Sequence, residues 1–259
     1  MPEALQYHFP EVTLLITHYN RSRSLERLLK RYKELNCRFG EIVVSDDGSK
    51  AEHIEYINAL KSIFSFTVVT TEKNKGLGNN INKGQDAVKT PFTLYVQEDF
   101  DPTEAFPGRF SEAVQMFNER TDIDIVRFYA YFKYPYLKPY KHGFSEMQFN
   151  MLKPGYKKFY YYSDHPHLRR SNFLQKFGRY PEGRKVEKTE YLMMMSFLQK
   201  KGKGLFYEDF QSLFVQKNSA EEPSTVKRNF WRQSESPFIS FARHSYRYLK
   251  FYFDVLFAK

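Results

Sequence analysis

The chain has 259 residues, 41% of them hydrophobic, and a formal net charge of +10, values that indicate a folded basic protein with a substantial core and exclude a disordered chain. Its single cysteine, Cys37, excludes an internal disulfide, fits a reducing compartment and is expected to be an inert thiol. The positive charge favours partners that carry anionic groups, such as nucleic acid, anionic lipid or a phosphate-bearing substrate.

No apolar run approaches the ~20 residues that span a bilayer, and the first residues show no secretory signal pattern. We therefore expect a cytoplasmic protein, with peripheral attachment to the inner face of a membrane as a further option.

The first half of the chain alternates between short apolar runs and helical patterns. We predict strands at residues 12–17, 41–45, 66–71, 92–96 and about 124–128. From apolar side chains at helical spacing we predict helices at residues 24–33, 51–63, 79–88 and 106–118. This alternation is typical of an α/β fold with a mostly parallel sheet flanked by helices, in which ligands bind at the carboxyl ends of the strands.

The pattern changes from about residue 129. The stretch 129–162 is rich in aromatic and lysine side chains and predicts either a long irregular excursion or a small hairpin. Beyond it we predict two helices and a strand, at residues 172–177, 188–201 and 204–207. The predicted organisation is one domain over residues 1–217, with halves at about 10–128 and 129–217, followed by a tail over 218–259.

The tail carries an amphipathic helical pattern from Ser236 onward. Its apolar face consists of Phe238, Phe241, Ala242, Tyr246, Leu249, Phe253 and Leu256. A second face carries Arg243, Arg247 and Lys250. The pattern predicts either a helix that packs on the core or a basic amphipathic helix on an anionic membrane surface, and the charge and aromatic content of the chain favour the membrane surface.

Three polar motifs follow the predicted strands of the first half. They are the turn Asp46-Asp47-Gly48-Ser49, the asparagine- and glycine-rich segment 74–84, and Gln97-Glu98-Asp99. Glycine lets a backbone approach a ligand closely, and carboxylates can hold a divalent cation against a diphosphate. Their shared position predicts a nucleotide–metal site, although the acidic turn alone could be a strand-to-helix connection with an N-cap serine.

Together with Thr17-His18-Tyr19-Asn20, these motifs resemble the nucleotide half of the family 2 glycosyltransferases, over roughly residues 10–215. The resemblance implies the GT-A fold, which is Rossmann-like, and a hexosyltransferase-like enzyme that uses a nucleotide-diphosphate sugar, usually with inversion. It implies a nucleobase site in which Asp47 accepts a hydrogen bond from the base and Tyr19 packs on the ring. The donor-site residues expected from this match are Thr17, Tyr19, Asn20, Asp46, Asp47, Asn74, Gly76 and Asn82.

The carboxylates after the fourth strand depart from the Asp-x-Asp pattern of the family. By position, Asp99 is the expected ligand of Mn²⁺ or Mg²⁺, and Glu98 is expected to contact the ribose or the water shell of the metal. An alternative register, Asp99-Phe100-Asp101, makes Asp101 the ligand. Gln97 removes one charge from the usual cluster, which weakens the expected metal affinity.

The segment 187–192 resembles the Glu-Asp-x-x-Leu element of the family, in which a carboxylate takes the proton of the acceptor hydroxyl. Glu190 is the candidate base and Glu187 the alternate, although the helix dipole also favours glutamates at a helix N-terminus. His165 and Arg169 lie in a segment that the family uses near acceptor and diphosphate, and they are candidate phosphate contacts.

The resemblance implies metal-assisted sugar transfer to a hydroxyl of a glycan or lipid-linked acceptor. A sugar nucleotidyltransferase would normally carry a glycine-rich phosphate loop after the first strand, where this chain has Thr17-His18-Tyr19-Asn20-Arg21. A nucleic-acid or polyanion-binding module could use the aromatic and lysine side chains of 131–162. That interpretation leaves the ordered acidic motifs unexplained, so no nucleic-acid partner is expected.

Overall fold

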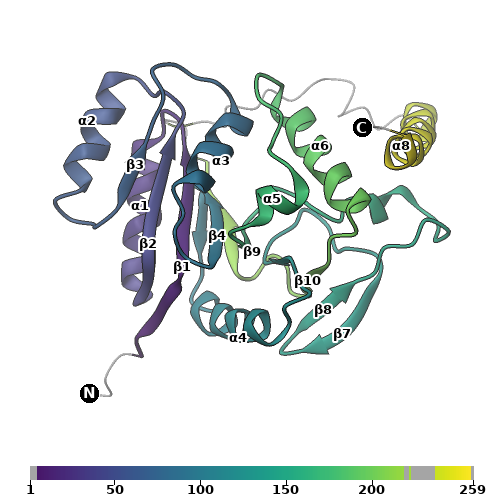
Figure 1. Cartoon of the computed structure of the whole chain (residues 1–259), viewed down its shortest axis with the longest axis horizontal. Coiled ribbons are helices and arrows are strands. Elements are labelled where there is room, and N and C mark those ends of the chain that lie inside the picture. The colour runs from purple at the N-terminus through teal and green to yellow at the C-terminus, as the bar shows by residue number, and fades with distance from the viewer. Residues whose placement is uncertain (1–4, 219–221, 223–236, 258–259) are drawn as a thin grey trace.

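The computed structural model describes residues 5–218, Glu222 and residues 237–257, with the side chains of the last helix described from Ser245 onward. Within these residues a nine-stranded sheet has the order β3-β2-β1-β4-β9-β6-β10-β8-β7 (Figure 1). Its strands are β1 Tyr7–His18, β2 Cys37–Asp46, β3 Thr67–Val69, β4 Phe92–Gln97, β6 Ile125–Arg127, β7 Leu137–Lys141, β8 Phe144–Met147, β9 His167–Arg170 and β10 Gly204–Tyr207. A separate antiparallel pair joins β5, Phe100–Pro102, to β11, Phe214–Gln216.

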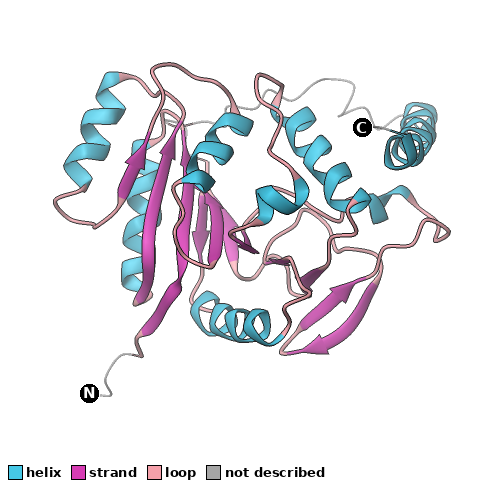
Figure 2. Cartoon of the chain, in the orientation of Figure 1, coloured by secondary structure: helices cyan, strands magenta, loops and turns pink. Residues whose placement is uncertain are grey.

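Helices cover both faces of the large sheet (Figure 2). They are α1 Ser22–Glu34, α2 Ala51–Leu60, α3 Leu77–Asp86, α4 Phe106–Glu119, α5 Phe173–Phe177, α6 Val186–Gln199 and α8 Pro237–Phe257, with a 3₁₀ helix η1 at Tyr156–Phe159. One apolar core contains side chains of α1, α2 and α4, and a second core contains side chains of α3, α5, α6 and α8.

Each strand contributes alternate side chains to the two cores, because successive side chains of a strand point to opposite faces of the sheet. Leu14 and Ile16 of β1 belong to the first core, whereas Leu15 between them belongs to the second. In β4, Leu94 lies in the first core and Tyr95 in the second. The continuous apolar runs of the sequence therefore come from strands that are buried on both faces.

The strands of the first half are parallel, as the alternation of strands and helices predicts. β1 pairs in parallel with both β2 and β4, and Thr17 lies opposite Ser45 on one side and Gln97 on the other. The polar motifs that follow these strands consequently begin at one edge of the sheet. The predicted α/β architecture is confirmed in this half.

The second half adds antiparallel strands, and the sequence analysis missed two of them, β9 and β11. β9 lies between β4 and β6 and is antiparallel to both. Its pattern is hard to recognise because two of its four residues are arginines, and Arg169 is nevertheless fully buried. The stretch 129–162 contains the hairpin β7–β8 followed by η1, which agrees with the hairpin alternative. The division of the chain after residue 217 remains a proposal.

Candidate active site at the carboxyl ends of the strands

His18 and Asp46 form a buried pair where β1 and β2 end. The Nδ1 atom of His18 lies 2.8 Å from Oδ1 of Asp46, which also accepts a hydrogen bond from the Ser49 hydroxyl at 2.5 Å. Thr70 donates to Oδ2 at 2.7 Å. Burial opposes ionisation of Asp46, but these hydrogen bonds outweigh it and hold its pKa well below the usual range. This is a correction to the expected donor contact, because four hydrogen bonds, from His18, Thr70 and the backbone and side chain of Ser49, already occupy the two oxygens of Asp46.

Asp47 joins the acidic turn to the asparagine- and glycine-rich segment. Its two carboxylate oxygens accept backbone N–H groups of Lys75 at 2.8 Å and Gly76 at 2.9 Å. Burial raises the pKa of Asp47, and these two hydrogen bonds offset part of that increase. Because an ionised carboxylate can accept about four hydrogen bonds, Asp47 keeps capacity for a further donor.

Gly48 lets the two loops approach one another. It has a φ of +67°, and a Cβ atom there would lie 2.4 Å from the carbonyl carbon of Lys73. A side chain at this position is therefore excluded by the neighbouring loop. The Asp-Asp-Gly-Ser turn is thus more than a strand-to-helix connection, since it forms one unit with segment 74–76.

The remaining residues expected around the nucleobase differ in exposure. Thr17 is buried, with its hydroxyl 3.1 Å from the Tyr95 hydroxyl. Asn20 has a φ of +53° and accepts the Lys50 N–H at 2.9 Å. Tyr19 is half-buried and Asn74 is exposed. Thr17 hence contacts the interior and Asn20 holds the backbone of the following helix start, whereas Tyr19 and Asn74 keep surface for a ligand.

Asn82 does not face this site, which corrects the expected donor contact. Its amide nitrogen donates to the Tyr180 carbonyl and to the Glu182 carboxylate, each at 2.9 Å, and its oxygen accepts the Tyr180 N–H at 3.0 Å. The residue is 1% exposed. Its hydrogen bonds fasten α3 to the segment that precedes α6.

Arg169 is also a correction, because its guanidinium is occupied within the core. Nε and Nη2 donate to the Gln85 side-chain oxygen at 3.0 and 2.7 Å, and Nη1 donates to the Tyr180 hydroxyl at 3.3 Å. The residue is fully buried. It stabilises the interior beside β9 and presents no group to a phosphate.

Glu98 and Asp99 form a buried acidic pair around Arg21. Nη1 of Arg21 lies 3.3 Å from Glu98 and 3.4 Å from Asp99. Burial and then the charge of Asp99 raise the pKa of Glu98 to about 7, and the charge of Arg21 offsets part of the increase. Gln216 donates to Oδ2 of Asp99 at 3.0 Å, whereas Oδ1 is buried without a hydrogen-bond partner among the described residues. A buried carboxylate oxygen that accepts no hydrogen bond is suited to binding a cation.

Asp101 lies in a different environment. Nε of Arg27 donates to both of its oxygens at 3.1 and 2.9 Å, and the ammonium group of Lys217 lies 3.1 Å away. Two cations already compensate this carboxylate. The geometry therefore favours Asp99 over Asp101 as a metal ligand. Within the described chain no three His, Cys, Asp or Glu side chains converge on one metal position, so a bound ion would take most of its ligands from substrate and water.

Glu190 lies just after the first turn of α6, next to a second carboxylate that the sequence analysis overlooked. The backbone N–H of Asp164 donates to Oε1 of Glu190 at 3.0 Å. Burial and then the charge of Asp164 raise the pKa of Glu190 to about 7. Oδ1 of Asp164 accepts the hydroxyls of Tyr162 and Tyr180, both at 2.9 Å. Glu187, one turn earlier, is half-buried.

Asp164 connects the two halves of the site. Gln97, two residues before Asp99, donates to the Asp164 carbonyl at 3.3 Å. The carboxylate oxygen Oδ2 of Asp164 is buried without a hydrogen-bond partner in the described part of the chain. The signal that could have identified Asp164 is its place immediately before the His165-Pro166-His167 sequence. Hydrogen bonds thus connect Gln97, the residue before the acidic pair, through Asp164 to the candidate base Glu190.

His165 is packed against aromatic rings. Its ring centroid lies 4.5 Å from that of Tyr131 and 5.4 Å from that of Tyr129. Burial and then the charge of Arg127 lower the pKa of His165 to about 3. The imidazole is consequently neutral at physiological pH and brings no positive charge to a phosphate.

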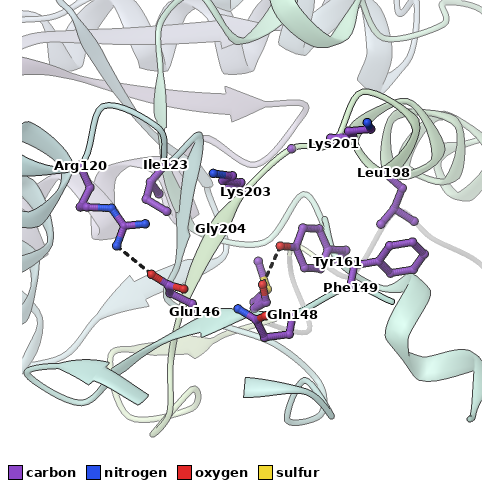
Figure 3. Close-up of a pocket in the computed structure, with 12 residues that line it drawn as sticks. Arg120, Ile123, Glu146, Gln148, Phe149, Tyr161, Leu198, Lys201, Lys203 and Gly204 are labelled. Atoms are coloured by element: carbon purple, nitrogen blue, oxygen red, sulfur yellow. Dashed lines mark hydrogen bonds and ion pairs between the residues drawn. The ribbon is translucent and has the colours of Figure 1, made fainter. Parts of the chain in front are cut away.

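A well-formed cavity of about 400 Å³ lies away from these residues (Figure 3). It is lined by residues near the beginnings of β6 and β10, including Ile123 and Gly204. Figure 3 shows Arg120 paired with Glu146 at one side of the cavity, and this hydrogen bond measures 2.7 Å. Because ligands of parallel sheets bind at the opposite ends of the strands, we do not assign the candidate active site to this cavity.

The sequence profile described as glycosyl transferase family 2 matches residues 13–179, well over half of the chain. The chain belongs to this family. A cholesterol galactosyltransferase of Borreliella burgdorferi is 24% identical over 127 residues, which are 48% of this chain and 34% of that protein. A poly-beta-1,6-N-acetyl-D-glucosamine synthase of Staphylococcus aureus is 27% identical over 88 residues, which are 34% of this chain and 21% of that protein. The chain thus matches about a third or less of the length of these relatives.

Solved structures confirm the predicted GT-A fold. S. aureus TarS 1–349 in complex with UDP-GlcNAc superposes with a TM-score of 0.62 and 16% identity, covering 96% of this chain and 76% of TarS 1–349. The mannosyltransferase PcManGT from Pyrobaculum calidifontis, in complex with GDP-Man and Mn²⁺, gives a TM-score of 0.57 and 13% identity, covering 93% of this chain and 65% of that one. At these identities the likeness concerns the fold.

Proposed function

We propose that this family 2 protein transfers a sugar from a nucleotide-diphosphate donor to a hydroxyl of a glycan or lipid-linked acceptor, with inversion and with assistance from Mn²⁺ or Mg²⁺. The observation that carries the proposal is the link from Gln97 through Asp164 to Glu190. It connects a carboxylate with a pKa of about 7 to Gln97, the residue that precedes the acidic pair of Glu98 and Asp99. A base and a site for the leaving diphosphate are the two elements that direct displacement needs.

The donor would occupy the edge formed by the ends of β1, β2 and β3. Tyr19 and Asn74 offer accessible side chains there, and Asp47 keeps acceptor capacity for a base N–H. Backbone hydrogen bonds of Asn20 and Gly76 hold the chain around them, and Thr17 contacts Tyr95 beneath the site. Nucleotide sugars bound to TarS and PcManGT support a donor of this class.

The acidic pair fits a divalent ion. Asp99, through its unpartnered Oδ1, and Glu98 would hold the ion, which when bound supplies positive charge to the departing diphosphate. Arg21 contacts both carboxylates, and its charge favours the ionised form of Glu98. The Mn²⁺ in the PcManGT complex supports this assignment.

Glu190 would accept the proton of the acceptor hydroxyl. A pKa of about 7 leaves a large fraction of this carboxylate ionised at neutral pH, while it remains basic enough to take a proton. The Asp164 N–H fixes one of its oxygens at 3.0 Å and leaves the other to face the acceptor. Glu187 is the reserve candidate.

We also propose that α8 attaches the protein to an anionic membrane surface. Phe251, which is 5% exposed, packs on Phe159 and Tyr191 and fixes the helix to the domain. The opposite face leaves large apolar side chains exposed: Tyr246, Leu249, Phe253, Leu256 and Phe257. Among the described helices none has the length and apolar character of a membrane span. The tail residues Phe238, Phe241, Ala242 and Arg243 lie outside the described side chains.

Nucleotide binding and turnover test the proposed function. We expect the full chain to bind at least one nucleotide sugar, with UDP-GlcNAc and GDP-mannose as first probes, and to bind it more tightly with Mn²⁺ than with a chelator. Calorimetry measures the affinities, and release of nucleoside diphosphate measures turnover. A sugar nucleotidyltransferase would instead release pyrophosphate from a nucleoside triphosphate and a sugar phosphate. Affinity for RNA without affinity for any nucleotide sugar would support the polyanion-binding alternative.

A further inference from the structure

Tyr131 is an exposed aromatic residue with a fixed orientation. Its side chain belongs to a cluster with Phe100, Tyr129 and His165, of which Phe100 and Tyr129 are buried. Tyr131 itself is 60% exposed, yet its ring stands at 83° to the His165 ring with centroids 4.5 Å apart. Its hydroxyl donates to the Gln216 side-chain oxygen at 3.3 Å. Single exposed apolar residues are common in proteins. The Tyr131 ring differs from them because a ring contact and a hydroxyl hydrogen bond fix its orientation, so that it can bind a ligand without further ordering.

The position of this ring is the second observation. Gln216, which accepts from Tyr131, also donates to Oδ2 of Asp99 at 3.0 Å. After burial and Tyr129, the charges of Asp99 and Glu190 both contribute to raising the pKa of Tyr131. The phenol is therefore within electrostatic reach of the candidate metal ligand and of the candidate base. A sugar acceptor must lie between these two groups during transfer.

The chemistry of the ring favours a carbohydrate. The face of an aromatic ring carries negative partial charge, and the C–H groups on one face of a pyranose are weakly positive and apolar. Stacking orients such a sugar without using its hydroxyls, so one of them stays free to meet Glu190. The imidazole ring of His165 packs perpendicular to the Tyr131 ring and holds it in place.

We propose that Tyr131, supported by His165, is the stacking platform for the sugar ring of the acceptor, so that the acceptor is a carbohydrate and not a sterol or another hydroxyl compound without a sugar. This inference rests on the proposed function and specifies its substrate class. Tyr131 follows β6 in the second half of the chain, whereas the donor motifs follow β1, β2 and β3 in the first half. For this reason the platform is assigned to the acceptor and not to the donor.

The experiment compares Tyr131→Ala and Tyr131→Phe with the wild-type full chain. Tyr136→Ala is the matched control, because Tyr136 comes from the same aromatic stretch but donates to the Pro154 carbonyl next to the edge strand β7. The probes are methyl glycosides of common hexoses and N-acetylhexosamines, added to protein that is saturated with the nucleoside diphosphate it binds. Saturation-transfer NMR measures their binding, calorimetry measures donor affinity, and thermal melting checks the fold.

We expect at least one glycoside to bind the wild type through its ring C–H groups. Tyr131→Ala should weaken that glycoside roughly tenfold, since an aromatic contact of this kind is worth about 1 kcal/mol or somewhat more. Tyr131→Phe should retain the affinity within about twofold, because stacking needs the ring and not the hydroxyl. Tyr136→Ala should match the wild type, and every variant should keep its donor affinity.

Three results would overturn the inference: no glycoside binds the donor-loaded wild type, Tyr131→Ala binds glycosides normally, or Tyr131→Ala weakens the donor instead. Binding of a solubilised sterol in place of glycosides would also overturn it. Each of these outcomes is distinct from failure of the proposed function, which shows itself as absence of nucleotide-sugar binding to the wild-type protein.

Discussion

Glu190 is half-buried and its carboxylate accepts a hydrogen bond from the Asp164 N–H, and these two features determine how its charge depends on pH. Its pKa of about 7 lies above the ordinary value of 4.5 because burial and the charge of Asp164 disfavour the ion. The folded protein hence binds this proton more tightly than the unfolded chain does. Stability due to this group is full below about pH 4.5 and is lost as the pH rises through 7.

Glu190→Gln should lower turnover by ~10²-fold or more with little loss of donor affinity, because the missing group acts in proton transfer. The wild-type rate should rise with pH through about 7 as the carboxylate ionises. Unlike an ordinary surface glutamine substitution, this one should also raise the melting temperature above pH 7, where the wild type must bury an ion. Steady-state kinetics and melting curves between about pH 5 and 9 measure both effects.

Asp164→Asn provides the control for that assignment. It keeps the backbone N–H that holds Glu190 but removes the neighbouring charge, so the pH at which activity appears should move downward. An unchanged pH profile in Asp164→Asn, with Glu190→Gln fully active, would place the base elsewhere.

We predict opposite effects on metal stimulation for substitutions of Asp99 and Asp101. Asp99→Asn should abolish stimulation by Mn²⁺ or Mg²⁺ and leave the fold intact, because Oδ1 of Asp99 has no hydrogen-bond partner among the described residues. Asp101→Asn should keep the stimulation but lower the melting temperature, because it removes the pairs with Arg27 and Lys217. Metal titrations of nucleotide-sugar turnover compare the two. The reverse pattern would establish the Asp101 register, and full activity in chelator would refute both.

Whether a strand or helix can be predicted from the sequence depends on which contacts stabilise it. The parallel strands β1, β2 and β4 bury apolar side chains on both faces and stand out as continuous apolar runs, so they and the motifs at their ends could be predicted. β9 could not, since Arg169 is buried only by virtue of Gln85 and Tyr180, of which Gln85 lies far away in sequence. For the same reason Asn82 looked like a ligand contact, and its true partners became visible only in three dimensions.

The contact between the acidic turn and segment 74–76 can be tested with a pair of glycines. Gly48→Ala should destabilise the protein and weaken donor binding, because its Cβ would meet the Lys73 backbone at 2.4 Å. Gly183 has a similar φ of +65°, but a Cβ at Gly183 would have open space around it to 4 Å within the described chain. Gly183→Ala should then cost only the left-handed backbone strain, about 1 kcal/mol. Urea unfolding and donor calorimetry separate the two, and equal effects would contradict the loop contact.

At the scale of the whole molecule, α8 is both part of the domain and a candidate surface anchor. Lys250 pairs with Asp254 and lies over the Tyr191 ring, so much of its charge is used within the protein. Apolar contact should therefore contribute more to membrane binding than the basic residues do, which is a shift from the sequence-based hypothesis.

We predict that replacing Leu249 and Phe253 with serine releases the protein from vesicles that contain anionic lipid and leaves its stability and donor affinity unchanged, because the two side chains are 70% and 62% exposed. Phe251→Ala should instead lower the melting temperature, since it opens a hole against Phe159 and Tyr191. Vesicle sedimentation measures the release. If the full-length protein does not bind such vesicles, the role of α8 is limited to packing on the core.

The fastening of α3 to the segment before α6 has a consequence for engineering. Asn82 holds Tyr180 and Glu182, and a Cβ at Gly78 would lie 2.4 Å from the Pro181 carbonyl oxygen. The first and second halves of the chain are thus held together at this point and do not form independent modules. A chimera that grafts the second half of a relative onto this first half should succeed only if residues 180–182 stay with their own α3, so the useful crossover points lie after Glu182 and not at the midpoint of the chain.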